Sequence, residues 1–505
     1  MTNDYTLLGK EEEASGAPRQ PKRQRTLHYL KALVIFAIWS SFFLAFLSLK
    51  KKKHAPRNVI LMVSDGFGPA SETFARQYHA WKDGLPMDSV FPLDKIIVGQ
   101  SRTQSSSSLI TDSAAGATVF ACGLKTFNGA IGVDPDKTPC GTILESAKIH
   151  HHMKTGLVVK SRVTHATPAS FSAHVNWRDW ENTIAEQQIG HNPLGRTLDL
   201  MFGGGLCEFL SNQTEGSCRQ DDRNLLKEAQ EQFGWHLITK KEQLDQLQNK
   251  KVTLPLMGLF ASHHMDYALD RDPDVQPSLV EMTNKALDIL KDSKQGFFLM
   301  IEGSRIDMAA HVNDPAAHYH EILEYQQTVA AVTEFVSRQP NTILISVSDH
   351  ETGGLTVGRQ VTDDYPEYAW SPEVIERANN STEQLSLAWA KAVQDKADTP
   401  EFLQIVLEHG LGIQDTTKEE FDRLWDWKDS DKGPEYFALI LSDILSTRAQ
   451  IGWTTMGHTA VDVNLYAYGH QADQLRGNQE NTDIGKFIVN YLKLDLKDIT
   501  KKLNR

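Results

Sequence analysis

The strongest constraint on the fold is an alternation of short, nearly continuous apolar runs with longer helical patterns, which begins at Asn58. Strands that are apolar on both faces are typical of a parallel sheet covered by helices on each side, because both faces are then withdrawn from water. The pattern therefore predicts an α/β fold, a three-layer sandwich around a mostly parallel central sheet. The expected strands are 58–63, 156–159, 297–301, 342–347 and 465–468.

Residues that can bind metals or take part in catalysis stand at the ends of these expected strands. Ligands of open α/β sheets bind beyond the carboxyl ends of the strands, where side chains from neighbouring strands meet. We therefore expect the acidic and histidine residues at these positions to converge at one edge of the sheet. They are Asp65, Glu302, Asp307, Asp349, His350 and His458.

The chemistry of this set suits divalent metals. Carboxylate and imidazole groups together are typical ligands of Zn²⁺, whereas an all-oxygen set is typical of calcium. Asp307 and His311 are four residues apart, so one helical turn places them on the same face. Such a pair alone is usually a surface contact, but with the strand-end residues it makes three Asp, three His and one Glu. That set is enough for two zinc sites and one oxygen-rich magnesium site.

Ser113 stands just before a run of small residues in the segment TDSAAGAT. This pattern predicts the start of a helix that packs closely against the sheet, with the serine at the positive end of the helix dipole. The alternative is a serine that only caps the helix. A serine hydroxyl needs a general base or a metal to become a good nucleophile, and no Gly-x-Ser-x-Gly turn is present. Metal activation is therefore the better interpretation.

Two further residues lie in the segment that begins HATPAS. Thr167 offers an oxygen ligand to a cation, and Arg178 offers a planar guanidinium that can hold two phosphate oxygens at once. An arginine in a loop is more often solvated or paired with a carboxylate, so the interpretation of Arg178 as a phosphate-binding residue depends on the other site residues.

Taken together, these motifs resemble the alkaline phosphatases, most closely the fungal vacuolar, membrane-anchored kind, from about residue 58 to residue 469. The motifs that carry the resemblance are SDGFGP, TDSAAGATVFACG, HATPAS, GFFLMIEGSRIDMAAH, SVSDHETGG and TTMGHTAV. Several separate motifs in the family's order make an accidental match very improbable.

The resemblance implies an assignment for each site residue. Asp307, His311 and His458 correspond to the ligands of a first Zn²⁺, and Asp65, Asp349 and His350 to those of a second. Asp65, Thr167 and Glu302 correspond to the ligands of one Mg²⁺, Ser113 to the nucleophile and Arg178 to the phosphate clamp. The implied activity is hydrolysis of many phosphomonoesters through a phosphoserine intermediate, with release of inorganic phosphate at alkaline pH. The family also implies a homodimer.

Two positions depart from relatives. His165 stands where bacterial members carry Asp and animal members His, and Met308 stands where bacterial members have Lys and animal members His. Because methionine cannot donate a hydrogen bond, no hydrogen bond from position 308 to phosphate is expected. Magnesium affinity and turnover are expected to differ from those of bacterial members.

Residues 32–49 form an 18-residue run without a charge. As a helix it spans about 27 Å, close to the roughly 30 Å of a bilayer core. A cleaved signal peptide is the alternative, but lysines 50–53 follow where small cleavage-site residues are expected. The predicted organisation is a cytosolic tail at 1–31, a transmembrane signal anchor at 32–49, a basic linker at 50–57 and a lumenal domain at 58–505, with about 360–450 as an elaboration over one end of the sheet.

The orientation of this signal anchor does not follow from charge, because basic residues flank it on both sides. Glycosylation sequons at Asn212, Asn379 and Asn380 favour a lumenal catalytic domain, as does a disulfide expected between Cys207 and Cys218. The prediction is a single-pass type II protein, placed in the vacuole membrane by the family resemblance.

Two smaller predictions concern the remaining sequence. Cys122 lies in an apolar stretch and is expected to be a buried thiol rather than part of a disulfide. Residues 4–8, DYTLL, resemble the sorting signals that cytosolic adaptors bind.

The net charge of −13 excludes one class of partner. Residues 1–57 hold 11 basic and 4 acidic residues, so the rest of the chain has a formal charge of −20. Such a surface repels nucleic acid, and no nucleic-acid partner is expected. A pocket with three divalent cations, four carboxylates and Arg178 is formally plus three, which still attracts phosphate.

Other functions of the same metal scaffold are alternatives. Sulfatases need a C-x-P-S-R type sequence, which is absent, and a phosphodiesterase would lack the Arg178 clamp and the third metal. A cofactor-independent mutase shares the scaffold as well. Outside enzymes, the alternative is a lumenal metal-binding or adhesion protein that has lost activity, although Ser113 and every predicted ligand are present.

Overall fold

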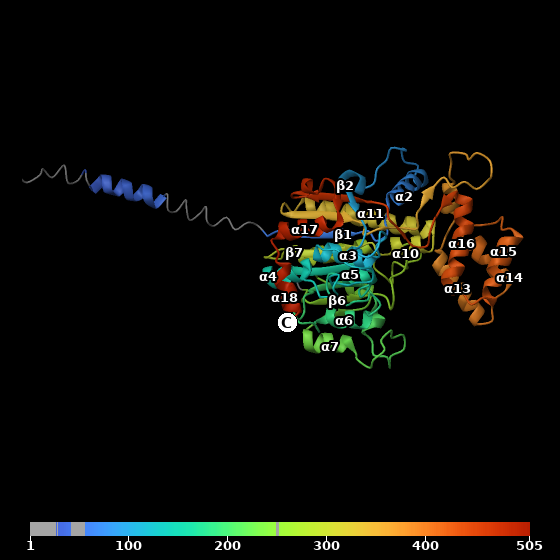
Figure 1. Ribbon diagram of the computed structural model, residues 1–505, viewed down its shortest axis with the longest axis horizontal. Coiled ribbons are helices and arrows are strands. Elements are labelled where there is room, and N and C mark those ends of the chain that lie inside the picture. Colours follow the sequence, from blue (N-terminus) through green and yellow to red (C-terminus); the bar gives the residue numbers. More distant parts are fainter. Residues whose placement is uncertain (1–26, 28, 42–55, 249–251) are drawn as a thin grey trace, which may run out of the picture. The chain divides into compact units, whose positions relative to one another are not determined.

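The computed structural model describes residues 27, 29–41, 56–248 and 252–505 (Figure 1). The chain divides into two compact units, Met1–Ala55 and Pro56–Arg505. In the first unit, residues 29–41 are helical. None of the helices within the described ranges is both long and apolar enough to cross a membrane. The predicted signal anchor continues through residues 42–49, which lie outside the described residues together with most of the tail and linker, so the anchor stays a prediction.

A ten-stranded sheet forms the middle of the second unit, in the order β14-β2-β13-β8-β1-β7-β3-β4-β6-β5. The five strands expected from the sequence are present. All ten are β1 (Asn58–Val63), β2 (Ile97–Arg102), β3 (Lys154–Arg162), β4 (Leu200–Gly204), β5 (His236–Ile238), β6 (Leu256–Leu259), β7 (Phe297–Glu302), β8 (Thr342–Val347), β13 (Val463–Gly469) and β14 (Gly477–Glu480). Two small antiparallel pairs stand apart from this sheet: β9 (Glu351–Thr352) with β12 (His458–Thr459), and β10 (Thr356–Val357) with β11 (Ile451–Gly452).

Strand β1 shows why the sheet is buried on both faces. Ile60 and Met62 belong to one hydrophobic core, whereas Val59, Leu61 and Val63 belong to the other, and all five are fully buried. Because successive side chains of a strand point to opposite faces, an unbroken apolar run supplies both cores at once. The predicted three-layer α/β sandwich is confirmed.

Helices cover each face of the sheet. Those that contribute to the core of Ile60 are α2 (Pro69–Lys82), α8 (Lys241–Asp245), α9 (Leu279–Leu290), α10 (Arg305–His311), α11 (Pro315–Ser337), α12 (Pro372–Glu376), α13 (Thr382–Gln394), α14 (Pro400–Ile405), α15 (Lys418–Trp425) and α16 (Pro434–Ala449). Those that contribute to the core of Val59 are α3 (Ser113–Cys122), α4 (Ile143–His151), α6 (Glu181–Ile189), α7 (Leu225–Phe233) and α17 (Asn481–Leu492). The remaining α-helices described in this unit are α5 (Ala166–Ala169) and α18 (Leu496–Leu503).

Helices α13, α14, α15 and α16 stand together at one end of this unit (Figure 1). They fall in the stretch that the sequence predicts as an elaboration. Trp389 of α13 is fully buried among Phe402, Trp425 and Phe437, so these helices are held together by an aromatic cluster of their own.

Strand β13 differs in direction from its two neighbours in the sheet. β13 pairs antiparallel with both β8 and β2, and Leu465 lies opposite Val347. An apolar run does not reveal strand direction, since a buried strand has the same pattern either way. The consequence matters for the site: the segment that precedes an antiparallel strand lies at the edge where the parallel strands end, and that segment holds His458.

The cysteines form two disulfides, Cys122–Cys140 and Cys207–Cys218. The expected Cys207–Cys218 bond is confirmed, but the prediction of a buried free thiol at Cys122 is wrong. Cys122 ends α3, and Gly123 follows with a φ of 68°, in the left-handed conformation that ends many helices. Cys140 is 18 residues farther on, so no local pattern shows that the loop returns to the end of α3.

Candidate active site

Three parallel strands end at the same level, and this sets the position of the site. Val63 of β1 lies beside Glu302 of β7 on one side and Val347 of β8 on the other. The residues just beyond these strand ends include Asp65 and Asp349. The expected convergence at one edge of the sheet follows from this register, because parallel strands in step deliver their next residues to one place.

Tight turns keep the predicted ligand residues close to the strand ends. Gly66, directly after Asp65, has a φ of 73°, a conformation that glycine adopts without strain. A Cβ atom added to Gly66 would lie 2.7 Å from the Cα atom of Asp307, closer than real Cβ contacts. The glycine therefore allows the Asp65 turn and helix α10 to touch.

Ser113 is the first residue of α3, as the sequence predicts. The carboxylate of Asp112 caps this helix and accepts a hydrogen bond from the Ala115 backbone N–H at 3.0 Å. A Cβ atom at Gly116 would lie 2.9 Å from the Cβ atom of Asp349, so the helix packs directly against the end of β8. The small residues of this helix thus bring Ser113 against the strand-end carboxylates.

The first group of predicted ligands surrounds Ser113. The Ser113 hydroxyl lies 3.0 Å from Nε2 of His350 and 3.5 Å from Oδ1 of Asp65. The same Nε2 atom lies 3.3 Å from Oδ2 of Asp349. Asp65, Asp349 and His350 present donor atoms within 4.8 Å of one another and are buried, which is the arrangement a bound metal ion requires.

The second group is built on α10. Nε2 of His311 lies 3.2 Å from Oδ2 of Asp307 and 3.2 Å from Nε2 of His458. On the far side of each ring, Nδ1 of His458 is 2.8 Å from the Thr111 carbonyl, and Nδ1 of His311 contacts the Met456 carbonyl. Donation from Nδ1 to a carbonyl leaves the Nε2 lone pair free for a metal. The expectation that Asp307 and His311 share a helix face holds.

The third group involves Asp65 and Glu302. Their carboxylates and a ring nitrogen of His165 lie within 4.8 Å of one another. Oε2 of Glu302 accepts hydrogen bonds from the hydroxyls of Ser161 at 3.1 Å and Ser304 at 2.6 Å. Thr167 of α5 is fully buried as well. Sequence reasoning named His165 as a point of difference from relatives, and the structure places it among the ligand candidates.

Unpaired buried atoms test whether cations fit these groups. Among the described residues, Oδ2 of Asp65 and Oε1 of Glu302 are buried without a hydrogen-bond donor. A buried carboxylate oxygen without a partner is costly, and a divalent cation removes that cost. The residues present therefore fit metal ions.

Comparison with known proteins supports the same conclusion. Residues 56–494 match the sequence profile of the family described as alkaline phosphatase. The chain is 47% identical to an alkaline phosphatase of Schizosaccharomyces pombe over 501 residues, 96% of this chain and 91% of that one. The chain belongs to the alkaline phosphatase family. The prediction of an alkaline phosphatase enzyme is confirmed.

Two further likenesses extend this result. The phosphatase is 44% identical to the repressible alkaline phosphatase of Saccharomyces cerevisiae, over 93% of this chain and 86% of that one. Its fold matches the crystal structure of a cold-active alkaline phosphatase from the psychrophile Shewanella sp. with a TM-score of 0.73 and 32% identity, over 86% of this chain and 99% of that one.

Charge crowding in the phosphatase site shifts several pKa values. Burial, reinforced by the charge of Asp307, raises the pKa of Asp349 to about 8, and burial raises that of Glu302 to about 7. The pKa of Asp65 is raised well above its ordinary value by burial and by Asp349. The charge of Asp307 raises the pKa of His311 to about 9. A bound cation would stabilise the ionised form of the three carboxylates whose pKa values are raised, those of Asp65, Glu302 and Asp349.

Arg178 lies beside Asp112, the residue that caps the helix beginning at Ser113. One guanidinium nitrogen is 3.1 Å from Oδ2 of Asp112, and the other is 3.1 Å from Nε2 of His165. The side chain is 23% exposed, so it is reachable from solvent. Because Asp112 directly precedes Ser113, this pairing holds the guanidinium next to the serine. Both the functional and the salt-bridge interpretations of Arg178 are therefore compatible with its position.

The side chain of Met308 lies in an apolar environment. Its side chain packs against a small apolar cluster of Tyr267, Ala309 and Ala317. It has no hydrogen-bond donor to offer a phosphate. The position of Met308 therefore agrees with the expectation that it donates no hydrogen bond to phosphate.

Sequence reasoning missed several polar residues around the predicted ligands. Thr352 contacts both Asp307 and His350, and Ser161 and Ser304 support Glu302. Thr352 stands two residues after His350 in SVSDHETGG, so its place in that motif was the available signal. Ser161 carried no signal, because it lies within an apolar strand.

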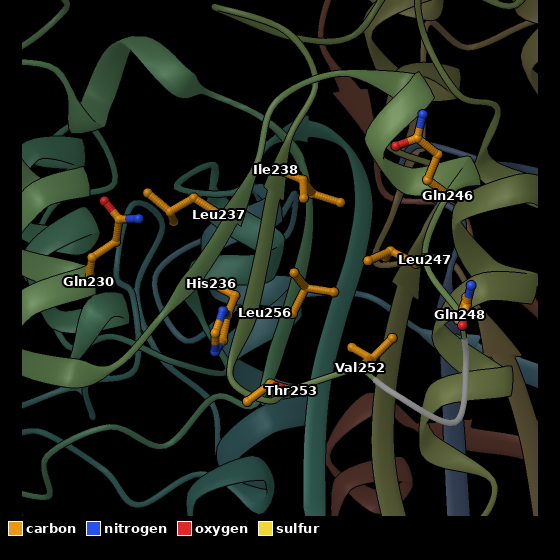
Figure 2. A pocket seen from close by; sticks show the side chains of 10 residues that line it. All are labelled: Gln230, His236, Leu237, Ile238, Gln246, Leu247, Gln248, Val252, Thr253 and Leu256. Atoms are coloured by element: carbon orange, nitrogen blue, oxygen red, sulfur yellow. The ribbon is translucent and has the colours of Figure 1, made fainter.

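A pocket of about 510 Å³ elsewhere in the unit does not belong to the site. Figure 2 shows it beside the edge strand β5, with Leu237 and Ile238 of β5, Leu256 of β6, and Gln246 and Leu247 from the segment at the end of α8 around it. None of the predicted ligands, nor Ser113 or Arg178, lines this pocket.

Proposed function

We propose that this alkaline phosphatase hydrolyses phosphomonoesters with Ser113 as the nucleophile and a phosphoserine intermediate. The observation that carries the proposal is the position of the Ser113 hydroxyl, buried at the start of α3 and 3.0 Å from Nε2 of His350. In a serine-histidine-aspartate triad the aspartate lies at Nδ1 of the histidine. Here the carboxylates of Asp65 and Asp349 lie instead at Nε2 of His350, the atom that faces Ser113, which favours a metal ligand over a general base.

The proposed metal complement is two Zn²⁺ and one Mg²⁺. Asp307, His311 and His458 would hold the first Zn²⁺, and Asp65, Asp349 and His350 the second. Asp65, Thr167 and Glu302 would hold Mg²⁺. When bound, such ions lower the pKa of a serine hydroxyl or a water and stabilise the oxygen of the departing alcohol.

His165 is proposed to affect which metal the third site prefers. Its ring nitrogen lies with Asp65 and Glu302, and burial together with the charges of Arg178 and Arg162 holds the pKa of His165 well below its usual range. A neutral imidazole is an available ligand, and nitrogen ligands favour zinc over magnesium. Magnesium selectivity at this site is therefore proposed to be weaker than an all-oxygen set would give.

Side-chain and backbone groups of the protein are proposed to position the phosphate for attack by Ser113. Arg178 is proposed to hold two oxygens of the phosphate, next to the backbone N–H groups at the start of α3, so that phosphorus lies in line with the Ser113 oxygen. The serine oxygen bonds to phosphorus as the bond to the alcohol oxygen breaks. Water then attacks the phosphoserine, which restores Ser113 and releases inorganic phosphate.

Local charge supports the binding of an anion by an acidic protein. With its metals, four carboxylates and Arg178, the pocket is formally plus three, but Arg178 pairs with Asp112, which reduces the total to plus two. The charge of the rest of the domain is spread over a surface largely beyond a Debye length of about 8 Å, so the local field dominates.

Broad specificity and alkaline activity follow from the same proposal. The phosphate supplies the charged contacts, so different alcohols are accepted. A higher pH increases the fraction of serine alkoxide and of hydroxide, which favours turnover at alkaline pH.

The cellular setting is proposed from the sequence. We propose a type II protein of the vacuole membrane, anchored through 32–49, with a lumenal catalytic domain and a cytosolic tail that a sorting adaptor binds. Two disulfides favour an oxidising compartment, and Asn212 of the first sequon is exposed, as glycosylation requires. A homodimer is proposed from the family resemblance.

The test is to trap the intermediate. Brief incubation with ³²P-labelled phosphomonoester at acidic pH, followed by an acid quench, should label Ser113 in the wild-type enzyme. Ser113→Ala should bind the same amount of metal and give no labelled protein, with turnover lower by at least about 10³-fold, in the range that loss of an activated nucleophile costs. Full turnover by Ser113→Ala would overturn the covalent route. A phosphomonoester should also be hydrolysed far faster than its methyl diester, and the reverse order would favour a phosphodiesterase.

A further inference from the structure

We propose that Thr352 is a positioning residue that holds ligands of both proposed zinc sites in register and fixes the tautomer of His350. Thr352 lies on β9 and is fully buried. The inference rests on the proposed function, because the residues it concerns are those assigned there to zinc.

The side chain of Thr352 joins the two sites. Its hydroxyl oxygen is 2.5 Å from Oδ1 of Asp307, proposed for the first zinc, and 3.2 Å from Nδ1 of His350, proposed for the second. A hydroxyl has one proton to donate, and an ionised carboxylate can only accept. The Thr352 proton therefore goes to Asp307, and its lone pair remains to accept a hydrogen bond from His350.

This hydrogen bond decides which nitrogen of His350 carries the proton. An Nδ1–H that donates to Thr352 leaves Nε2 with a free lone pair. Nε2 is the atom that faces the Ser113 hydroxyl at 3.0 Å, Asp349 at 3.3 Å and Asp65 at 3.5 Å. The tautomer selected by Thr352 is the one that a metal beside Ser113 requires.

The backbone of Thr352 adds a third connection. β9 pairs antiparallel with β12, and Thr352 is the register partner of His458. Its neighbour Glu351 accepts a hydrogen bond from Gly354 N–H at 3.0 Å and contacts the Thr459 hydroxyl across the same pair of strands. One residue thus connects ligands that come from three separate parts of the chain: Asp307, His350 and His458.

The matched test replaces the hydroxyl while preserving shape. Thr352→Val removes the hydrogen bonds to Asp307 and His350, and Thr352→Ser keeps the hydroxyl. Thr155→Val is the control, because Thr155 is also fully buried and donates to the Thr197 carbonyl at 2.6 Å, but it lies near the start of β3, away from the strand ends that carry the site.

Zinc affinity is measured by competition with a chromogenic chelator, alongside kcat and KM for a chromogenic phosphomonoester. We expect Thr352→Val to bind zinc about 10- to 100-fold more weakly, the range found when a residue supporting a metal ligand is lost. At zinc concentrations that saturate the wild type, kcat should fall with zinc occupancy while KM changes less. The absorption spectrum of the Co²⁺-substituted variant should also change, because the ligand geometry changes. Thr352→Ser should restore all three properties, and Thr155→Val should leave zinc affinity and the spectrum unchanged.

Each alternative outcome is decisive. Unchanged zinc affinity and spectrum in Thr352→Val would overturn the inference, as would an equal loss of affinity in Thr155→Val. If Thr352→Val does not fold, Thr352→Ala compared with Thr352→Ser asks the same question. A wild-type enzyme that needs no zinc would instead overturn the proposed function, so the two failures are distinguishable.

Discussion

Gly116→Ala tests whether the close contact between α3 and the end of β8 is what places Ser113. The added Cβ atom would lie 2.9 Å from the Cβ atom of Asp349, whereas ordinary contacts begin at 3.4 Å. Either the helix that carries Ser113 or the strand end that carries Asp349 must therefore move by about 0.5 Å or more. In either case, Ser113 or Asp349 is displaced relative to the second proposed zinc site.

Gly116→Ala should affect turnover more strongly than stability. Overpacking costs about 1–3 kcal/mol, but alanine is favoured over glycine within a helix by about 0.5–1 kcal/mol, so the free energy of unfolding should fall by about 0 to 2.5 kcal/mol. Misplacement of reacting groups is felt more strongly, because a shift of about 1 Å can lower turnover by about 100-fold. We expect kcat to fall by about 10- to 100-fold with a modest change in Tm.

The assay measures zinc per chain, Tm and kcat for Gly116→Ala and for Gly485→Ala. Gly485 of α17 is an equally tight position, where a Cβ atom would lie 2.7 Å from the Phe120 carbonyl oxygen, but its contacts are at the other end of α3. Gly485→Ala should lose stability and keep its zinc and its kcat per folded molecule. Wild-type kcat and zinc content in Gly116→Ala would refute the reasoning, since the serine would then not depend on this contact.

Two further predictions concern phosphate binding and acid stability. Arg178→Ala should raise the inhibition constant of inorganic phosphate by about tenfold or more, the effect of losing a charged hydrogen bond, with a smaller effect on kcat; Arg178→Lys should recover only part, and unchanged phosphate inhibition in Arg178→Ala would contradict the clamp. Burial lowers the pKa of His318 to about 4, so between about pH 6.5 and pH 4 the unfolded chain binds a proton that the folded protein does not. The contribution of neutral His318 to the free energy of unfolding is therefore complete above pH 6.5 and is lost as the pH falls toward 4, by up to about 3 kcal/mol. Tm of His318→Gln should fall less steeply over this pH range than Tm of the wild type. Parallel curves of Tm against pH would contradict this prediction.

Several features of the fold and site are readable from residue order alone. An unbroken apolar run such as 58–63 is compatible with few environments other than a sheet buried on both faces. The helix start at Ser113 and the shared face of Asp307 and His311 are equally local, because capping and the helical repeat act over a few residues.

Other features depend on which distant segments meet. The direction of β13, the Cys122–Cys140 bond and the role of Thr352 are of this kind. Nothing near Thr352 in the sequence shows that its hydroxyl faces Asp307, 45 residues away.

The sequence by itself indicated most of the elements of the phosphatase, the residues proposed as its metal ligands and the chemistry that they can perform, since these depend on side-chain type and short spacing. Only the tertiary structure decided how the ligands are supported: that an antiparallel strand brings His458 to the shared edge, that His165 joins the third group, and that one threonine hydroxyl lies between Asp307 and His350. The physical reason is that a hydrogen bond depends on distances of a few ångströms between atoms, and chain folding sets those distances independently of separation along the sequence.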